Sequence, residues 1–205
     1  MVEQSKRPFL IGLTGSIGMG KSETAKIFLR LGMPVYDADK AVSELYSVGG
    51  AAVGAIGLAF PGVVKNGAVD RQALSNFVTV NKSAFKRLEE IVHPLACNIR
   101  RAFLDEASKD GAAFAVLEIP LLFEVGSEKD VDAIIVVSAP ADVQRARVFE
   151  RPGMTEEKFA AIIARQIPDA EKRAKADFVI DTSKGLDHAA GQVEEIFSVI
   201  KERMG

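Results

Sequence analysis

The chain has 205 residues, of which 48% are hydrophobic and 26% charged, and its formal net charge is −2. This composition is that of an ordinary globular protein and excludes a disordered or fibrous chain. The near-neutral charge argues against a dedicated nucleic-acid-binding protein, which usually carries a basic excess. The single cysteine, Cys97, cannot form an internal disulfide, so nothing requires an oxidising compartment. The length fits one α/β domain with insertions, or two small domains.

Two uncharged stretches could direct the chain to a membrane, and neither has the right properties. Residues 9–13 are apolar but shorter than the hydrophobic region of a signal peptide. Residues 45–64 carry no charge, yet five glycines and a proline interrupt them, which gives poor helix propensity. We predict a short helix there with Val53, Ile56 and Phe60 facing inward. The protein is expected to have no membrane segment and to act in the cytoplasm.

Five apolar runs predict the strands of one parallel sheet. They are continuously apolar rather than alternating, which favours a sheet that is covered on both faces. The runs are residues 9–13, 34–36, 113–119, 133–137 and 178–180. Helical patterns lie between them, including residues 21–31, which stop before Gly32, and residues 189–203. This alternation predicts a doubly wound α/β fold.

Two segments interrupt the alternation of strands and helices. The first separates the second strand from the third and is mostly helical, including residues 83–109 with an expected break near Pro94. The second, residues 145–173, is rich in arginine and holds a helix that Thr155 can cap. Such insertions often form substrate domains and lids. We therefore expect a core of residues 1–40, 110–145 and 174–205, a helical insertion at 41–109 and a lid at 146–173.

Residues 15–22 read Gly-Ser-Ile-Gly-Met-Gly-Lys-Ser and match the pattern G-x-x-x-x-G-K-[ST] in full. Glycines let successive backbone N–H groups point at phosphate oxygens, Lys21 can reach the β- and γ-phosphates, and Ser22 can bind Mg²⁺. The motif lies between an apolar strand and an amphipathic helix, as a phosphate-binding loop requires. The sequence therefore predicts that the protein binds a nucleoside triphosphate together with Mg²⁺. The expected nucleotide-binding residues are Gly15, Ser16, Ile17, Gly18, Met19, Gly20, Lys21, Ser22 and Glu23.

Two other classes of nucleotide-binding protein lack support in the sequence. A GTPase needs an N-K-x-D motif to read guanine, and Asn81-Lys82 is followed by Ser83 and Ala84 instead. An ATP-driven motor would normally carry a strand that ends in Asp-Glu, whereas residues 116–120 read Val-Leu-Glu-Ile-Pro. A small-molecule kinase remains, with a base near the acceptor hydroxyl and arginines over the transferred phosphoryl group.

Two carboxylates follow the second predicted strand, where ligands bind in open α/β sheets. Asp37 and Asp39 would share a face if the chain were extended there. Either could orient and deprotonate an alcohol, and either could cap the helix expected near Lys40.

Arginines and one buried acid are further candidates for the site. Arg145, Arg147 and Arg151 follow one another at helical spacing, and Arg147 and Arg151, at i and i+4, would share a helix face. This face could stabilise a phosphoryl group, or it could be an ordinary solvated surface. Glu118, inside an apolar strand, could hold Mg²⁺ through water, accept a hydrogen bond from Ser22 or form a buried salt bridge.

The remaining candidates carry weaker signals. A lone His93 is either structural or functional, and His188 is expected at the surface. Cys97 has no basic partner in the local pattern and is expected to pack in the core.

As a set, these residues resemble the dephospho-CoA kinase family from Ile11 to about Thr182. The resemblance rests on an ordered series of segments: Leu13-Thr14-Gly15-Ser16-Ile17-Gly18, Tyr36-Asp37-Ala38-Asp39, Gly67-Ala68-Val69-Asp70-Arg71-Gln72-Ala73-Leu74, His93-Pro94, Ile119-Pro120-Leu121-Leu122-Phe123-Glu124, Arg147 and Arg151 before Met154-Thr155, Arg165-Gln166, and Ala176-Asp177-Phe178-Val179-Ile180-Asp181-Thr182. The chain departs from the family at Thr182, where many relatives carry asparagine.

The resemblance implies a P-loop NTPase-type parallel sheet flanked by helices, with a helical CoA-binding insertion and an arginine-bearing lid. It implies ATP-dependent phosphorylation of the ribose 3′-hydroxyl of dephospho-CoA, with Asp39 as the base. The implied catalytic residues are Asp39, Lys21, Arg147 and Arg151; the substrate-binding residues are Asp37, Asp39, His93 and Leu121; the metal-binding residues are Ser22 and Glu118.

Neither nucleic acid nor a membrane is expected as a partner, and a monomer or small homo-oligomer is. The alternatives are another P-loop kinase of the nucleoside, nucleotide or shikimate type, and a nucleotide-binding regulatory module without transfer.

Overall fold

The computed structural model describes residues 7–79 and 81–204. The chain folds as two compact units. Within the described residues, the sheet unit takes residues 7–36 and 107–204, and the helical unit takes residues 37–79 and 81–106. None of the helices in these residues combines the length and apolar character needed to cross a bilayer.

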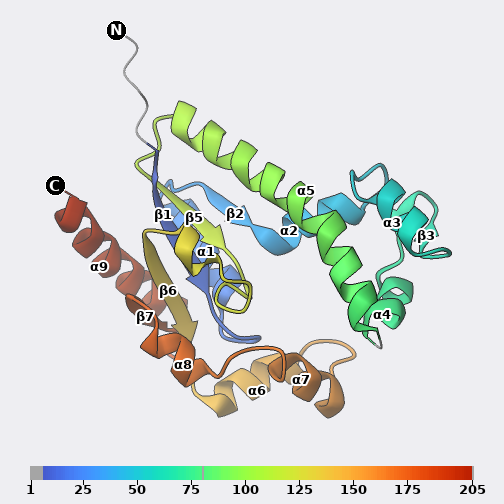
Figure 1. Ribbon diagram of the computed structural model, residues 1–205. Coiled ribbons are helices and arrows are strands. Elements are labelled where there is room, and N and C mark those ends of the chain that lie inside the picture. The colour runs from blue at the N-terminus through green and yellow to red at the C-terminus, as the bar shows by residue number, and fades with distance from the viewer. Residues whose placement is uncertain (1–6, 80, 205) are drawn as a thin grey trace, which may run out of the picture. The chain divides into compact units, whose positions relative to one another are not determined.

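The sheet unit is built on five strands: β1 (Phe9–Thr14), β2 (Val35–Asp37), β5 (Phe114–Glu118), β6 (Ala133–Ser138) and β7 (Phe178–Asp181). Their order is β2-β5-β1-β6-β7, and β1 pairs in parallel with both β5 and β6 (Figure 1). The β6–β7 pair is parallel too. All five predicted strands are confirmed, as is the α/β class. The register places Leu13 beside Glu118, so β1 leads into the phosphate-binding loop next to a carboxylate.

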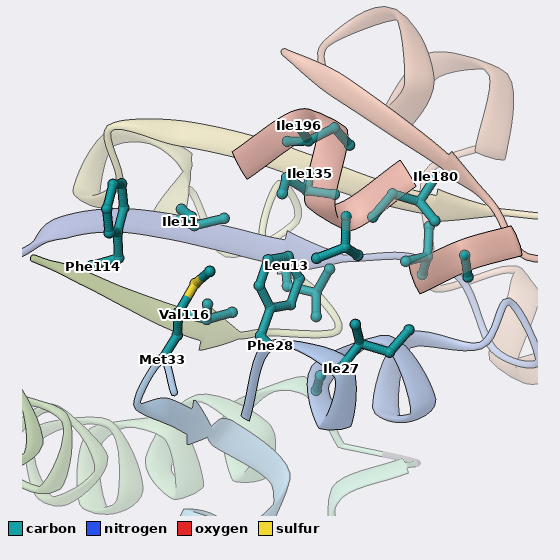
Figure 2. Close-up of a cluster of buried hydrophobic side chains, with 14 of the residues drawn as sticks. Ile11, Leu13, Ile27, Phe28, Met33, Phe114, Val116, Ile135, Ile180 and Ile196 are labelled. Carbon is teal, nitrogen blue, oxygen red and sulfur yellow. The ribbon is translucent and has the colours of Figure 1, made fainter. Parts of the chain in front are cut away.

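Helices α1 (Lys21–Arg30) and α9 (Leu186–Met204) pack against the sheet and against each other. Figure 2 shows Phe28 of α1 and Ile196 of α9 turned toward strand residues such as Ile11, Leu13 and Ile135. The predicted helix ends are confirmed to within three residues. The expected left-handed Gly32 also follows α1, with φ of 78°. This packing holds in place β1 and α1, the two elements that the phosphate-binding loop connects.

The rest of the sheet unit contains four short helices, two of which lie within the arginine-rich segment, residues 145–173. They are the 3₁₀ helix η1 (Ser127–Asp130), α6 (Ala141–Phe149), α7 (Glu156–Ile163) and α8 (Asp169–Ala174). The predicted cap of α7 is confirmed, because the Thr155 side chain accepts a hydrogen bond from the Lys158 amide.

The helical unit contains α2 (Ala38–Tyr46), α3 (Val53–Ala59), a β3–β4 hairpin (Val64–Lys65 and Ala68–Val69), α4 (Arg71–Thr79) and most of α5 (Lys82–Lys109). Ile56 and Phe60 are buried in its core, as predicted, and Val53 packs against them. The hairpin was not predicted. Its two-residue turn is Asn66-Gly67, both with positive φ, a sequence that favours a tight hairpin.

The expected break at Pro94 is wrong, because α5 is continuous through it. Proline removes one backbone hydrogen bond, and a helix can absorb this loss by bending. In Figure 1, α5 changes direction near its middle. Half-buried residues at helical spacing on both sides of Pro94, including Ile91 and Leu95, pack against the core of the helical unit. Tertiary packing therefore keeps the helix intact.

Candidate active site

The phosphate-binding loop links β1 to α1, and its glycines are required by backbone geometry. Gly18 and Gly20 adopt φ of 77° and 86°, a left-handed conformation that glycine adopts without strain. A Cβ on Gly15 would lie 2.4 Å from Val137 Cγ2 and 2.6 Å from Val137 O, so no side chain fits there. The motif therefore encodes a curled backbone held closely against β6.

The first turn of α1 presents backbone N–H groups without acceptors inside the helix. The first intrahelical bond runs from the Thr24 amide to Gly20 O at 3.0 Å, and no side chain caps the N-terminus. The amides of Lys21, Ser22 and Glu23 thus have no acceptor within the helix. Together with the positive end of the helix dipole, they form a site that favours a phosphate group.

Lys21, Ser22 and Glu118 meet at the base of the loop. Glu118 Oε1 lies 2.5 Å from Lys21 Nζ and 3.0 Å from Ser22 Oγ, which both donate to it. The side chains of Lys21 and Glu118 are only 13% and 4% exposed. Two of the predicted contacts of Glu118, the salt bridge and the bond from Ser22, therefore exist together. A buried carboxylate is costly without partners, and here both partners come from the loop.

The oxygens of Ser22 and Glu118 are ligands of the kind that Mg²⁺ prefers. No group of three or more His, Cys, Asp or Glu side chains that could hold a metal occurs in the part of the chain that the structure describes. A magnesium ion at this point would therefore take its other ligands from phosphate groups and water, which is the usual arrangement for Mg²⁺.

The arginines are not arranged as one continuous helix face. Helix α6 ends at Phe149, so Arg151 lies beyond it, contrary to the predicted helical spacing. Arg147 Nη1 and Nη2 donate to Thr182 Oγ1 and O at 2.9 and 2.7 Å, and Arg145 pairs with Glu156. A pocket of about 340 Å³ nevertheless brings two arginines together beside the loop. Its lining residues are Gly18, Gly20, Glu23, Thr24, Arg147, Arg151, Thr182, Gly185, Leu186 and Ala189.

The predicted acidic pair lies at the start of the helical unit. Asp37 caps α2, its Oδ1 accepting from the Lys40 amide at 2.9 Å. Asp39 is exposed in the first turn of the same helix. The helix begins at Ala38 rather than near Lys40, so the expectation of a shared face in an extended chain is wrong. Residues two apart on a helix do not face each other.

The other predicted residues have ordinary surroundings. Leu121 is half-buried in the segment after β5, while His93 is exposed on α5 and His188 is exposed as expected. Cys97 is half-buried rather than a core residue, and its Sγ lies 3.7 Å from His93 Nε2. The expectation of a core position for Cys97 is therefore wrong, and its i, i+4 spacing from His93 places the two side chains on one face of α5.

Sequence reasoning missed a buried ion pair behind the site. Lys172 of α8 is fully buried, with Nζ 2.9 Å from Glu124 Oε1. The same oxygen accepts from the Ile167 amide at 2.9 Å. A lysine flanked by charged residues on a short helix gives no local signal of burial. This pair fixes the end of the arginine-rich segment to the segment that follows β5.

The parallel sheet, the loop between β1 and α1, and the arginine-lined pocket define a P-loop protein of the kinase type. Shikimate kinase from Bacteroides thetaiotaomicron shares this fold, with a TM-score of 0.53 at 16% identity. The family model for dephospho-CoA kinase matches residues 9–188. The chain belongs to the dephospho-CoA kinase family and is therefore a kinase.

Individual relatives agree with the family model over nearly the whole chain. A dephospho-CoA kinase from Agrobacterium fabrum is 56% identical over 91% of this chain and 95% of its own length. One from Mesorhizobium japonicum is 52% identical over 96% and 98%. The solved dephospho-CoA kinase from Campylobacter jejuni has a TM-score of 0.69 at 27% identity, covering 96% of this chain and 98% of its own.

Proposed function

We propose that this chain transfers the γ-phosphoryl group of ATP to the ribose 3′-hydroxyl of dephospho-CoA, giving CoA and ADP. The observation that carries the proposal is the loop itself, with uncapped amides at the start of α1 and Lys21 and Ser22 held on Glu118. Membership of the dephospho-CoA kinase family supports the choice of acceptor.

In this reaction the sheet unit binds and orients the triphosphate. The first amides of α1 donate to phosphate oxygens, and Lys21 neutralises the β- and γ-phosphates while Glu118 fixes the position of its ammonium group. Ser22 would hold Mg²⁺ directly and Glu118 would hold it through water. When bound, the ion would neutralise charge that develops on the phosphate oxygens. The pocket beside the loop, which Arg147, Arg151 and Thr182 help to line, has room for part of the nucleotide.

The transfer step needs a base and cationic groups around the moving phosphoryl. The hydroxyl oxygen forms a bond to the γ-phosphorus, the bond to the bridging oxygen breaks, and Asp39 takes the proton. Arg147 and Arg151 stabilise the transferred group. We assign the acceptor to residues 41–109, with Asp37, His93 and Leu121 contributing contacts, and a lid function to residues 146–173.

One assay tests the proposed reaction against its alternatives. The purified chain is incubated with ATP, Mg²⁺ and, separately, dephospho-CoA, adenosine, AMP or shikimate, while ADP release is followed and products are identified by mass. ADP formed only with dephospho-CoA, with one phosphate added to it, is the expected result. Turnover only with another acceptor would replace the substrate, and ATP binding without any turnover would support a regulatory module instead.

We further propose that the protein acts in the cytoplasm, as a monomer or small homo-oligomer and without nucleic acid. The single cysteine, which cannot form an internal disulfide, supports the cytoplasm. The net charge of −2 supports the absence of nucleic-acid binding. Sedimentation of the purified chain, alone and with duplex DNA or RNA, checks the oligomeric state and the absence of nucleic-acid binding.

A further inference from the structure

Two glutamines hold one residue of the phosphate-binding loop from both sides of its backbone. Gln144 Nε2 donates to Ile17 O at 2.8 Å, and the Ile17 amide donates to Gln166 Oε1 at 3.2 Å. Gln144 lies on α6, just before the arginine-rich lid segment, and Gln166 lies near the end of that segment. Gln144 is buried, although it is a polar residue on a helix with several charged neighbours. Both backbone groups of Ile17 are thus paired with the region that follows β6.

The region that follows β6 also packs closely against Gly18 and Met19 of the loop. A Cβ on Gly18 would lie 2.6 Å from Val148 Cγ2 and 2.9 Å from Gln144 O, so α6 approaches the loop as closely as a glycine allows. The Ala139 amide lies 3.1 Å from Met19 Sδ. The side of the loop that faces α6 and Ala139 is therefore occupied by protein contacts. The amides of the first turn of α1, in contrast, have no acceptor within the helix.

Gln166 is itself anchored in the sheet unit. The next residue, Ile167, donates its amide to Glu124, which also pairs with the buried Lys172. Two residues further along, Asp169 Oδ2 accepts from Ser138 Oγ at 2.8 Å at the end of β6. These contacts fix the backbone that follows Gln166, so its amide oxygen is presented to the loop from a rigid support.

We propose that Gln144 and Gln166 are positioning residues that hold the phosphate-binding loop in its binding conformation and couple the lid segment to it. The inference rests on the proposed function, because it assigns the loop to ATP. Ile17 N is occupied by Gln166, so this amide supports the loop rather than binding phosphate. A loop that is already curled binds the triphosphate without first being ordered, and loss of either contact lowers affinity for ATP.

The test compares variants that remove or keep each hydrogen bond. Gln166→Met and Gln144→Met keep the side-chain length and lose the bond to Ile17. We expect each to weaken ATP binding about 3- to 10-fold, the range for one hydrogen bond, with an equal rise in KM for ATP. The KM for dephospho-CoA should change by less than about twofold, because we assign acceptor binding mainly to residues 41–109, which include neither glutamine.

A charged pair of variants separates hydrogen bonding from electrostatics. Gln166→Glu and Gln144→Glu add the same negative charge beside the same residue. A glutamate at 166 still accepts from Ile17 N, whereas one at 144 can no longer donate to Ile17 O. Gln166→Glu should therefore bind ATP more tightly than Gln144→Glu. Equal weakening in both would show that charge, and not the loop contact, determines affinity, which contradicts the proposal.

A matched control comes from the same unit. Asp177 Oδ2 accepts from the Ile134 amide at 2.7 Å, so it too fixes a backbone residue, at the start of β6 and outside the pocket that Arg147 and Thr182 line. Asp177→Leu removes this hydrogen bond and should lower the melting temperature without changing the Kd for ATP. If Gln144→Met and Gln166→Met behave like this control, both glutamines are merely structural and the proposal is wrong.

The binding readout keeps the proposal separate from the assigned reaction. Kd for ATP is measured by calorimetry on the full chain and needs no turnover. A chain that binds ATP but does not phosphorylate dephospho-CoA would overturn the proposed acceptor and leave the glutamine comparison intact. Failure of the wild-type chain to bind ATP would overturn both.

Discussion

The sheet unit and the helical unit are stabilised by cores of very different size. Among the described residues, most of the largest fully buried side chains belong to the sheet unit, including Ile11, Leu13 and Phe28, whereas Ile56 and Val63 belong to the helical unit. Regions with fewer buried apolar contacts open at lower free energy. The helical unit should therefore open more readily.

This contrast matches the division of labour that we propose. Electrostatic catalysis needs donors that are already in place, and the loop is mounted on the packed β1–α1 connection. Binding a bulky acceptor tolerates, and often requires, a more adaptable surface. Variants in the two units should therefore fail in different ways.

The largest effect is expected in the helical unit, at Asp39. Asp39→Asn keeps the shape of the side chain but cannot take a proton, so turnover should fall by ~10²–10⁴ while ATP binding is nearly unchanged. Steady-state kinetics and nucleotide titration measure the two quantities. Asp37→Asn is the matched comparison, because asparagine caps helices as well as aspartate and the bond from the Lys40 amide can persist. If Asp37→Asn were inactive and Asp39→Asn active, the base would be the other carboxylate.

In the sheet unit, Lys21→Ala should lower turnover by roughly 10²–10³, the usual loss for one transition-state electrostatic contact. It also leaves the buried Glu118 without its cation, so the apo protein should lose stability. Adding Glu118→Gln removes that buried charge and should recover the melting temperature without recovering turnover. Recovery of both would mean that Lys21 acts only as a structural partner of Glu118.

Paired core substitutions test the difference in packing directly. Ile135→Ala and Ile56→Ala remove the same atoms from fully buried sites in the two units, and each should cost about 2–5 kcal/mol. Hydrogen exchange should show faster opening over the whole chain for Ile135→Ala. For Ile56→Ala the faster exchange should be confined to residues 37–106. Uniform acceleration in both variants would show that the units unfold as one.

The smallest effect concerns an ion pair that fastens the start of β1 to the segment before β6. Arg7 donates a hydrogen bond from each of its two terminal nitrogens to Asp132, which also accepts a hydrogen bond from the Leu10 amide. Burial favours the neutral acid, but these hydrogen bonds outweigh it and lower the pKa of Asp132. A lowered carboxyl pKa stabilises the folded state above the pKa of the unfolded chain, about 3.9, and this stability is lost as the pH falls through the folded pKa.

Asp132→Asn should therefore reduce the free energy of unfolding at pH 7 by at most about 1 kcal/mol, since Arg7 is largely exposed. The difference from wild type should begin to shrink below about pH 4, where the carboxyl group of Asp132 becomes protonated in the unfolded wild-type chain. Urea unfolding at pH 7 and pH 3.5 measures it. A difference that grows on acidification would mean that the pKa shift has the opposite sign.

Features that depend on neighbouring residues were predictable from the sequence. The five strands follow from continuous apolar runs, the loop from its glycines and Lys21, and the start of α7 from Thr155 followed by two acids. In each case the residues that determine the structure lie within a few positions of one another. The tight turn at Asn66-Gly67 was equally readable, although it was not predicted.

Only the tertiary structure decided the contacts between residues that lie far apart in the chain. Glu118 is paired with Lys21 nearly a hundred positions away, Lys172 is buried by Glu124, and Gln144 and Gln166 both meet Ile17. Pro94 stays helical because its neighbours pack against the core, not because of any local propensity. A polar side chain can point toward water or toward a distant partner from the same local sequence. The fold selects between these because a buried polar group is stable only where its partner is brought to it.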